Sequence, residues 1–432
     1  MSFSSDIFRG ERFAVLGLGR AGLPAAHALV AMGAEVTVWD DKPEARAQAE
    51  GLVVAEPVMA GLSALVISPG IPHRLPRAHP FAEAARAAGV PILTDADLLY
   101  RAVRASGSKA RFAGITGTNG KSTTTALLAH ILTVAGVPNA AGANLGTAAL
   151  ALPWLGDDGV YVLEMSSYML ERLAALRFDA AAMLNLSADH LDRHGDMAGY
   201  AAAKRQIFAR QTAGDTAVVG VDDALSRAMA DELTARVVRI SEHDVPIAIG
   251  PTLPGAHNAQ NVAAATALAR ALGVSDADIV AGIQTYAGLP HRLEKVATIG
   301  GVAWVNDSKA TNADSTARAL ACYQRIVWIA GGTAKEGGID TLTEFFPRVA
   351  HAYLIGRDAP MLAATLTRDG VAFTDVGTLE AAVSASAGYA ATHRVDVVLL
   401  SPACASWDQF TGFPQRGDRF RALAQQLSGE GG

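Results

Sequence analysis

The stretch GITGTNGKSTTT, residues 114–125, places three glycines, one lysine and a run of hydroxyl side chains between two apolar segments. The segment before it, ARFAGI, has the composition of a buried strand, and the segment after it, ALLAHIL, that of a helix. Glycines at such a junction let backbone N–H groups turn toward one point, and the helix N-terminus adds partial positive charge. The stretch therefore predicts a phosphate-binding loop, with Lys121 at the terminal phosphates and Ser122 as a ligand of Mg²⁺.

The loop departs from the usual phosphate-loop spacing at its first glycine. Ile115 stands five residues before Gly120, and the nearest glycines are Gly114 and Gly117. A glycine-rich turn without a ligand is therefore the plain alternative. The Gly-Lys-Ser sequence at the start of a helix favours phosphate over that alternative.

Strand and helix patterns alternate along the chain. Short runs rich in Val, Ile and Leu recur between Ala-rich segments of helical period; the runs are RFAVLGL, AEVTVW, ALVIS, RFAGI, VYVLE, AAMLNL, TAVVGV, VAWVN, RIVWIA, AYLIG and VDVVLL. Such alternation predicts an α/β fold of parallel, doubly wound sheets. We expect three domains: a Rossmann-like N-terminal domain at 1–98, a central P-loop ATPase-like domain at 99–288 and a C-terminal Rossmann-like domain at 289–432.

Composition argues against several classes of protein. The 432 residues exceed what one hydrophobic core usually organises. The formal net charge is -6 and Lys and Arg form no dense cluster, so we expect neither nucleic acid nor a membrane as a partner. Two cysteines are too few for a disulfide framework, and no apolar run reaches the ~18 residues that span a bilayer. We therefore expect a cytoplasmic protein.

Carboxylates follow two of the predicted strands. Glu164 ends VYVLE, where a second Mg²⁺ ligand is expected because open α/β sheets bind ligands at the carboxyl ends of strands. AAMLNL opens into SADHLDRH, which gathers Asp189, His190, Asp192 and His194. HLDRH lacks the glutamate of a zincin helix and no third ligand is evident, so a hard-oxygen site for Mg²⁺ is favoured over zinc. A solvated strand end and a loop of capping residues are the alternatives.

The first predicted domain contains a second glycine pattern. VLGLGRAGLP has Gly17, Gly19 and Gly22 in the spacing of a dinucleotide fingerprint, and Asp40 follows the next strand. A nicotinamide-dependent dehydrogenase would show this pattern, but hydride transfer requires no second phosphate loop. The two loops together suggest ATP and a second, pyrophosphate-carrying substrate.

The third predicted domain offers groups for a small anion. VAWVNDSKATN places Asp307, Lys309, Thr311 and Asn312 beyond a strand, and AGGTAKEGG places Lys335 in a loop beyond another. Ser406 and Gln409 have the spacing of a capping box. A helix starting there would be well capped, and with a nearby lysine it would bind the carboxylate of an amino acid.

Six motifs in order resemble the Mur ligase family of peptidoglycan synthesis. They are TGTNGKSTTT, EMSSY, NLSADHLDRH, HNAQN, GLPHRLE and NDSKATN, and together they cover nearly the whole chain. SPGIP and LLSPACASWDQFTGFPQRGDRF resemble the branch of the family that adds D-glutamate, and the DNPR motif of the diaminopimelate-adding branch is absent. The resemblance implies an ATP-dependent ligase that phosphorylates the carboxylate of UDP-N-acetylmuramoyl-L-alanine, whose acyl phosphate the amine of D-glutamate then attacks. A sister ligase with another amino acid or acceptor is the alternative within the family.

The resemblance also implies roles for single residues. For ATP it implies Gly117, Thr118, Asn119, Gly120, Lys121, Ser122, Thr123, Asn258, Asn261, Arg292 and Asp307. For two Mg²⁺ ions it implies Ser122, Glu164, His190 and Lys204, the last carbamylated by CO₂, since a carbamate offers oxygens where an ammonium would be repelled. Catalytic roles fall to Lys121, His190, Lys204 and Asn144.

For the other substrates the implied positions lie in the outer domains. The UDP substrate is expected at Gly19, Arg20, Ala21, Asp40, Gly70 and Asn144, with Arg20, Ala21 and Lys42 departing from better-known members. D-Glutamate is expected at Thr311, Lys335, Ser406 and Phe413. We expect a monomer whose domains close around the substrates. A nucleotide-binding switch without ligase activity is a further alternative.

Overall fold

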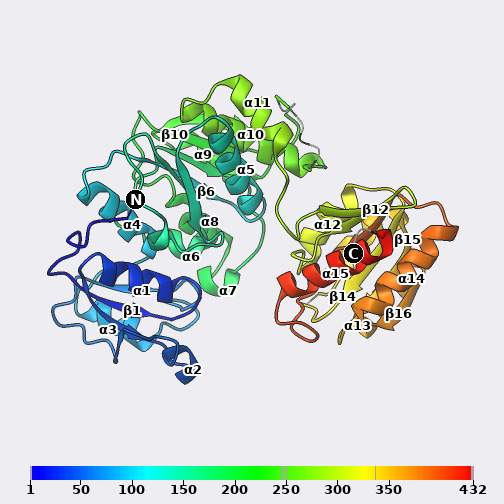
Figure 1. The fold of residues 1–432 in the computed structure, drawn as a ribbon, viewed down its shortest axis with the longest axis horizontal. Coiled ribbons are helices and arrows are strands. Elements are labelled where there is room, and N and C mark those ends of the chain that lie inside the picture. Colours follow the sequence, from blue (N-terminus) through cyan, green and yellow to red (C-terminus); the bar gives the residue numbers. More distant parts are fainter. Residues whose placement is uncertain (1, 245–246, 249, 251, 336, 430–432) are drawn as a thin grey trace. The chain divides into compact units, whose positions relative to one another are not determined.

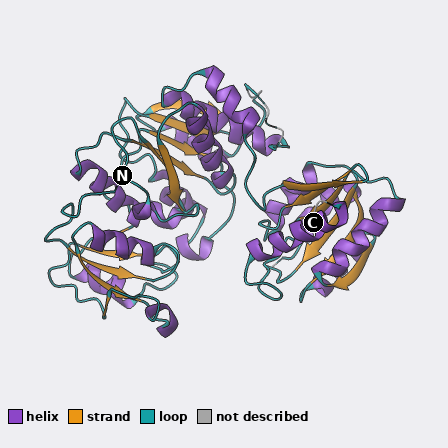
Figure 2. Cartoon of the chain, in the orientation of Figure 1, coloured by secondary structure: helices purple, strands orange, loops and turns teal. Residues whose placement is uncertain are grey.

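The computed structural model describes residues 2–244, 247, 248, 250, 252–335 and 337–429. The chain divides into two compact units, one comprising Met1–Ile249 and Asn258–Tyr286 and the other Gly250–His257 and Ala287–Gly432. Figures 1 and 2 show that each unit is built of sheets flanked by helices. The first unit contains two sheets and the second contains one. The three domain bounds predicted above stay a prediction.

The first sheet has the strand order β3-β2-β1-β4-β5 and is parallel throughout, which is the Rossmann-like order that the sequence predicts. Its strands are β1 (Arg12–Leu16), β2 (Glu35–Trp39), β3 (Val53–Val54), β4 (Ala64–Ile67) and β5 (Ile92–Leu93). Its helices are α1 (Gly22–Ala31), α2 (Pro43–Arg46), α3 (Pro80–Ala87) and α4 (Asp95–Ala105). In Figure 1 α1 and α3 lie on opposite faces of this sheet.

The second sheet is also parallel, with the order β11-β10-β9-β6-β8-β7. Its strands are β6 (Arg111–Thr116), β7 (Asn139–Ala143), β8 (Val160–Glu164), β9 (Ala180–Met183), β10 (Thr216–Gly220) and β11 (Arg236–Ile240). The helices are α5 (Lys121–Val134), η1 (Ala149–Ala151), α6 (Ser167–Leu170), α7 (Leu191–His194), α8 (Met197–Arg205), α9 (Ala224–Asp231), α10 (Ala256–Ala271) and α11 (Asp276–Thr285). One cluster of buried apolar side chains runs from Phe13 and Val15 of the first sheet to Phe112 and Leu163 of the second. The first two sheets therefore share a core.

The third sheet has the order β12-β13-β17-β14-β15-β16. Its strands are β12 (Glu294–Ile299), β13 (Val302–Asn306), β14 (Ile326–Gly331), β15 (Val349–Ile355), β16 (Phe373–Gly377) and β17 (Val397–Leu400), with α12 (Ala313–Ala321), η2 (Asp340–Arg348), α13 (Ala359–Arg368), α14 (Leu379–Thr392) and α15 (Phe413–Ser428). This sheet is mixed, because β12 pairs antiparallel with β13 through a short hairpin, whereas its other neighbouring strands pair parallel as predicted. Ile326 and Trp328 of β14 face one core and Val327 and Ile329 face another, so helices cover both faces.

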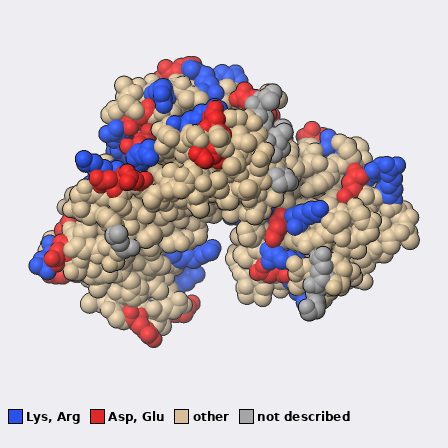
Figure 3. Space-filling view, turned by 45° about the horizontal axis from the view of Figure 1, so that its top comes forward, with Lys and Arg blue, Asp and Glu red and all other residues tan. Residues whose placement is uncertain are grey.

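Two surface properties bear on partners. On the face drawn in Figure 3, Lys and Arg side chains intermingle with Asp and Glu side chains. Within the part of the chain that the structure describes, none of the helices is both long and apolar enough to cross a bilayer.

Candidate functional site

The glycine-rich loop lies between β6 and α5, at the carboxyl edge of the second sheet. Gly117 has φ 149 and Gly120 has φ 86, a region that favours glycine. A Cβ on Gly120 would stand 2.2 Å from Oδ1 of Asn261, so the close approach of α10 also requires glycine. Helix α5 begins at Lys121, which leaves its first N–H groups directed at the loop.

The segment after β9 fixes this loop through hydrogen bonds. Thr118 N–H donates to the carbonyl of Asn185 at 2.8 Å, and Asn119 N–H donates to the Asn185 side chain at 2.9 Å. The Thr118 hydroxyl accepts from Ser187 N–H at 3.0 Å. The sequence reasoning assigned no role to Asn185, although it lies in the NLSADH motif. It fixes the loop through backbone contacts, which a residue pattern does not reveal.

Two lysines converge on one carbonyl of the loop. Nζ of Lys121 donates to Gly117 O at 2.8 Å, and Nζ of Lys204 donates to the same oxygen at 2.7 Å and to Thr116 Oγ1 at 3.2 Å. Lys204 is buried, with a relative exposure of 1%. Burial, and then the charge of Lys121, lower the pKa of Lys204 well below its ordinary value. The neutral amine is therefore favoured at this position.

Glu164 ends β8 beside the loop and is buried. Its Oε1 accepts a hydrogen bond from Asn144 Nδ2 at 2.5 Å, while its Oε2 has no hydrogen-bond partner among the residues that the structure describes. A buried carboxylate oxygen without a donor is costly unless a cation or ligand group satisfies it. This oxygen is suited to a metal ion.

The four acidic and histidine residues after β9 separate into two environments. His190 has φ 54, lies partly exposed near Asp189, and has its pKa lowered by burial and by the charge of Lys121. His194 is buried instead, with Nδ1 2.9 Å from Glu171 Oε1 and Nε2 2.9 Å from Ser167 Oγ. Both ring nitrogens of His194 therefore contact protein groups, whereas His190 is partly exposed.

Asn258 and Asn261 of α10 lie against the start of α5. Asn261 Nδ2 donates to Asn258 Oδ1 at 2.9 Å, and Thr124 Oγ1 donates to Asn261 Oδ1 at 3.2 Å. The structure thus brings together, in the first unit, the loop residues 117–123 and the more distant Asn258 and Asn261. Arg292 and Asp307 lie in the second unit.

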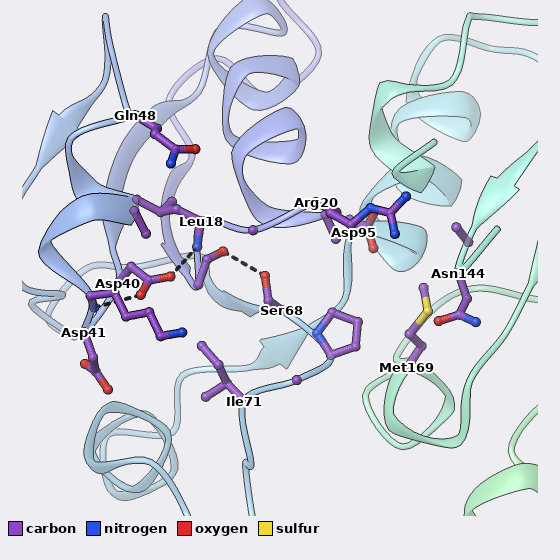
Figure 4. Close-up of a pocket in the computed structure, with 18 of the residues that line it drawn as sticks. Leu18, Arg20, Asp40, Asp41, Gln48, Ser68, Ile71, Asp95, Asn144 and Met169 are labelled. Atoms are coloured by element: carbon purple, nitrogen blue, oxygen red, sulfur yellow. Dashed lines mark hydrogen bonds between the residues drawn. The ribbon is translucent and has the colours of Figure 1, made fainter. Parts of the chain in front are cut away.

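A cavity of about 870 Å³ opens beyond the strands of the first sheet, and Figure 4 shows the side chains around it. All six positions expected for the UDP substrate line it: Gly19, Arg20, Ala21, Asp40, Gly70 and Asn144. A Cβ on Gly22 would meet the carbonyl of Gly17 at 1.8 Å, so α1 packs tightly on the loop, whereas a Cβ on Gly19 would meet nothing within 4 Å. The open side of Gly19 lets a ligand approach the backbone.

Asp40 lines this cavity, and both of its carboxylate oxygens accept hydrogen bonds from backbone N–H groups. Oδ2 accepts from Leu18 N–H at 2.8 Å and Oδ1 accepts from Lys42 N–H at 2.9 Å, and the first of these bonds is drawn in Figure 4. Asn144 lines the same cavity and also contacts Glu164. The cavity and the phosphate loop therefore share a boundary.

In the second unit, Asp307 follows β13 and is buried. It accepts from Leu293 N–H at 3.2 Å and from Ser401 Oγ at 2.8 Å, and burial raises its pKa to about 7. Lys309 lies over the ring of Phe413 at 5.3 Å, and Thr311 N–H donates to the carbonyl of Lys309. Thr311 therefore contacts the backbone of Lys309, and Phe413 contacts its ammonium.

The segment around Ser406 differs from the sequence prediction. Ser406 is buried, but residues 407–412 form turns and α15 begins only at Phe413, so the predicted helix capped by Ser406 and Gln409 is wrong. Ser406 O instead accepts from Phe410 N–H at 2.8 Å. Thr333 pairs with Ala405, which sets the exposed Lys335 loop beside this segment.

Arg416 organises these loops and was missed by the sequence reasoning. Its buried guanidinium donates to Ser308 O at 2.9 Å, to Cys404 O at 3.1 Å and to Gly331 O at 3.4 Å. It thereby joins the ends of β13, β17 and β14. In sequence it lies among the polar residues of a helix start, where a solvated arginine is the ordinary expectation.

These features define a nucleotide-dependent enzyme of α/β architecture with two ligand loops in its first unit. Comparison with known proteins narrows this class. Residues 115–246 match the Mur ligase middle domain, and residues 291–404 match the Mur ligase, glutamate ligase domain. The chain belongs to the Mur ligase family, whose members are ATP-dependent ligases that form amide bonds.

Among similar proteins, the UDP-N-acetylmuramoylalanine–D-glutamate ligase of Paramagnetospirillum magneticum is 48% identical, with 98% of each chain covered. The enzyme of the same name from Caulobacter vibrioides is 46% identical, again over 98% of each chain. The crystal structure of UDP-N-acetylmuramate-alanine ligase from Thermotoga maritima has a TM-score of 0.60 at 17% identity, covering 96% of this chain and 99% of that one. This last likeness supports the fold alone.

Proposed function

We propose that the chain is an ATP-dependent ligase that joins D-glutamate to UDP-N-acetylmuramoyl-L-alanine during the synthesis of peptidoglycan precursors. Two relatives named UDP-N-acetylmuramoylalanine–D-glutamate ligase are 48% and 46% identical to this chain over nearly its whole length. The observation that carries the proposal is the contact between Asn144 and Glu164. Asn144 lines the cavity proposed for the sugar nucleotide and Glu164 ends the strand beside the loop proposed for ATP, so the two sites adjoin, as phosphoryl transfer between their ligands requires.

The reaction follows from the chemistry of the carboxylate, which is a poor electrophile at neutral pH. In the first step an oxygen of the alanyl carboxylate attacks the γ-phosphorus of ATP, the bond to the β-phosphate oxygen breaks, and ADP leaves. In the second step the neutral amine of D-glutamate attacks the carbonyl carbon, the C–O bond breaks, and inorganic phosphate leaves. Lys121 and the N–H groups of loop 117–123 neutralise charge on the transferring group.

Four residues of this chain support the proton and charge changes. Burial lowers the pKa of His190, so its imidazole is neutral, and its one unprotonated nitrogen can accept the proton that the ammonium of D-glutamate must lose while no Mg²⁺ occupies that nitrogen. Two Mg²⁺ ions would be held by Ser122, Glu164, His190 and modified Lys204, and when bound they would neutralise phosphate charge. The unpartnered Oε2 of Glu164 fits such an ion. Among the described residues no three His, Cys, Asp or Glu side chains gather as metal ligands, so the modified lysine would supply oxygens that the chain otherwise lacks.

Carbamylation of Lys204 is part of the proposal. A neutral amine attacks CO₂, an N–C bond forms and one proton is released, which leaves a carbamate with two oxygens. The buried environment and the neighbouring Lys121 favour the neutral amine that this step needs. An unmodified ammonium at this position would be repelled by Mg²⁺.

The remaining assignments follow the resemblance to the family. We propose the UDP moiety in the cavity at Gly19, Arg20, Ala21, Asp40 and Gly70. Asn258, Asn261, Arg292 and Asp307 would bind the nucleoside and phosphates of ATP, and Thr311, Lys335, Ser406 and Phe413 would bind D-glutamate. A monomeric state and a cytoplasmic location stay predictions, which light scattering and cell fractionation check.

The test supplies UDP-N-acetylmuramoyl-L-alanine, ATP and Mg²⁺ and measures phosphate release with D-glutamate, L-glutamate, L-alanine and diaminopimelate. Release that depends on D-glutamate is expected. Dependence on another amino acid would identify a sister ligase, and ATP binding without release in any mixture would identify a nucleotide-binding switch. Binding of reduced nicotinamide with enhanced fluorescence would favour the dehydrogenase alternative.

A further inference from the structure

The four-residue helix α7 lies between the two ligand sites of the first unit. His190 immediately precedes it, and Arg193 within it donates from Nη1 to the carbonyl of Gly70 at 3.2 Å. Gly70 lines the cavity of the first sheet, and His190 neighbours the phosphate loop. Any displacement of α7 would therefore move groups at both sites, His190 at one and Gly70 at the other.

Side chains, and not the helix itself, hold α7 in place. A single turn is not stable in isolation, because its nucleation is costly and it has few backbone hydrogen bonds. His190 also has φ 54, a strained conformation for a residue other than glycine that persists only where the surroundings fix it. The turn thus needs an external anchor.

His194 provides this anchor through Glu171. Its side chain is fully buried, and both ring nitrogens are engaged, with Glu171 Oε1 at 2.9 Å and Ser167 Oγ at 2.9 Å. Its ring also packs against Tyr168 and Tyr200. These contacts connect α7 to α6 and α8, the helices that flank it.

The same glutamate connects α7 to the first sheet. Glu171 Oε2 lies 3.8 Å from His73 Nε2, which belongs to the loop that follows β4. The adjacent Arg172 donates to the carbonyl of Ile67, the last residue of β4, at 2.6 Å. Burial would raise the pKa of Glu171, but the hydrogen bond with His194 outweighs it and lowers the pKa. The carboxylate is therefore ionised and available to both histidines.

We infer that Glu171 and His194 are positioning residues that hold α7, so that His190 faces the phosphate loop while Arg193 holds the loop of the sugar-nucleotide cavity. The inference rests on the proposed function, because His190 has its role there. Neither residue touches a substrate: both act through the placement of His190.

The test compares Glu171→Ala with Glu171→Gln, which keeps an acceptor for His194, and with Glu11→Ala. Glu11 is a matched control, since it is a similarly exposed glutamate of the same unit that pairs with Arg101 at 2.8 Å. We expect Glu171→Ala to lower kcat by about 10- to 100-fold with little change in the KM for ATP, as a displacement near 1 Å does. Glu171→Gln should recover most of the rate, and Glu11→Ala should leave it unchanged.

A double-mutant cycle with His190 distinguishes a positioning role of Glu171 from general destabilisation of the protein. In a His190→Ala background, Glu171→Ala should cost less than about threefold, because residues that act as a unit are not additive. An equal loss of rate in both backgrounds would overturn the inference.

A third readout needs no ligase activity: hydrogen exchange of residues 187–195 should be faster in Glu171→Ala than in Glu11→Ala. Unchanged exchange would also overturn it. Failure of the wild-type chain to release phosphate would instead count against the proposed function.

Discussion

Two glycine loops of the first unit have the same backbone arrangement but differ in the charged side chains beside them and in how those side chains are hydrogen-bonded. Each follows a central strand of a parallel sheet and begins a helix, one at Gly17–Gly22 and the other at Gly117–Lys121. In the first, the acidic residue Asp40 has both oxygens hydrogen-bonded to the backbone, and the cavity beside it is about 870 Å³. In the second, Glu164 keeps a buried oxygen without a partner, and two lysines share one carbonyl.

The difference indicates that the first loop binds a ligand and the second stabilises a transition state. A loop whose charges are already satisfied can bind a ligand without acting on it, whereas a loop with concentrated, unsatisfied charge favours a transition state in which charge develops. We therefore expect changes in the first loop to alter KM for the sugar nucleotide, and changes in the second to alter kcat.

The largest expected effect is that of Lys121→Ala. Loss of this ammonium should lower kcat by about 1000-fold, as removal of one donor from a transition-state site does. Lys42→Ala, which removes a lysine from the cavity of the first loop, is the matched variant, and it should raise KM by no more than about tenfold. Steady-state kinetics of both variants check the contrast, and equal effects on kcat would break it.

Replacement of the two acidic residues comes next. Glu164→Gln should lower kcat by about 100-fold and raise the Mg²⁺ concentration needed for half-maximal rate, because a neutral amide binds the ion weakly. Asp40→Asn should leave the Mg²⁺ requirement unchanged and raise KM for the sugar nucleotide, since an amide has only one oxygen for two N–H groups. A magnesium titration of each variant measures the Mg²⁺ concentration needed for half-maximal rate. A higher requirement in Asp40→Asn would contradict the contrast between the loops.

Removal of CO₂ should affect the second loop alone. The pKa of Lys204 is lowered, so the amine is protonated only as pH falls through that value, and carbamate is then lost. We expect exhaustive degassing to lower the rate by about tenfold and bicarbonate to restore it, and we expect the rate with CO₂ present to fall as the pH is lowered. Binding of the sugar nucleotide, followed by calorimetry, should not change. A rate indifferent to CO₂ would contradict the modification.

The smallest expected effects are those of single methyl groups. Gly120→Ala should lower the free energy of unfolding by about 1–3 kcal/mol, because φ 86 and contact with Asn261 oppose a Cβ. Gly19→Ala should leave stability unchanged and raise KM for the sugar nucleotide, because its Cβ would project into open space beside the ligand. Thermal denaturation with and without the sugar nucleotide separates the two results.

The sequence predicted the interior of each sheet and missed its edges. Every strand recognised from the sequence is an interior strand, and the six missed strands, β3, β5, β7, β11, β12 and β16, are the two edges of each sheet. Interior strands such as β14 and β17 are buried throughout, so their residues form continuous apolar runs. Most residues of β11 and β16 are exposed or half-buried, and the sequences RVVRI and FTDVG carry polar residues like those of loops.

The candidate site shows the same limit. Glycine spacing and strand-end carboxylates predicted both loops, because these depend on local backbone conformation. Asn185, Arg416 and the Glu171–His194 pair act through contacts between distant segments, which one sequence does not display. The turn after Ser406 was mistaken for a helix because a capping pattern specifies a helix only where the following residues continue it.

The most direct test of the account follows oxygen from the carboxylate to phosphate. UDP-N-acetylmuramoyl-L-alanine labelled with ¹⁸O in both carboxylate oxygens is incubated with ATP, Mg²⁺ and D-glutamate, and the released phosphate is analysed by mass spectrometry. An acyl phosphate requires one ¹⁸O in each phosphate released, because the oxygen that attacked the γ-phosphorus leaves with it. Amide product accompanied by unlabelled phosphate would contradict phosphorylation of the carboxylate, and with it the role given to the second loop.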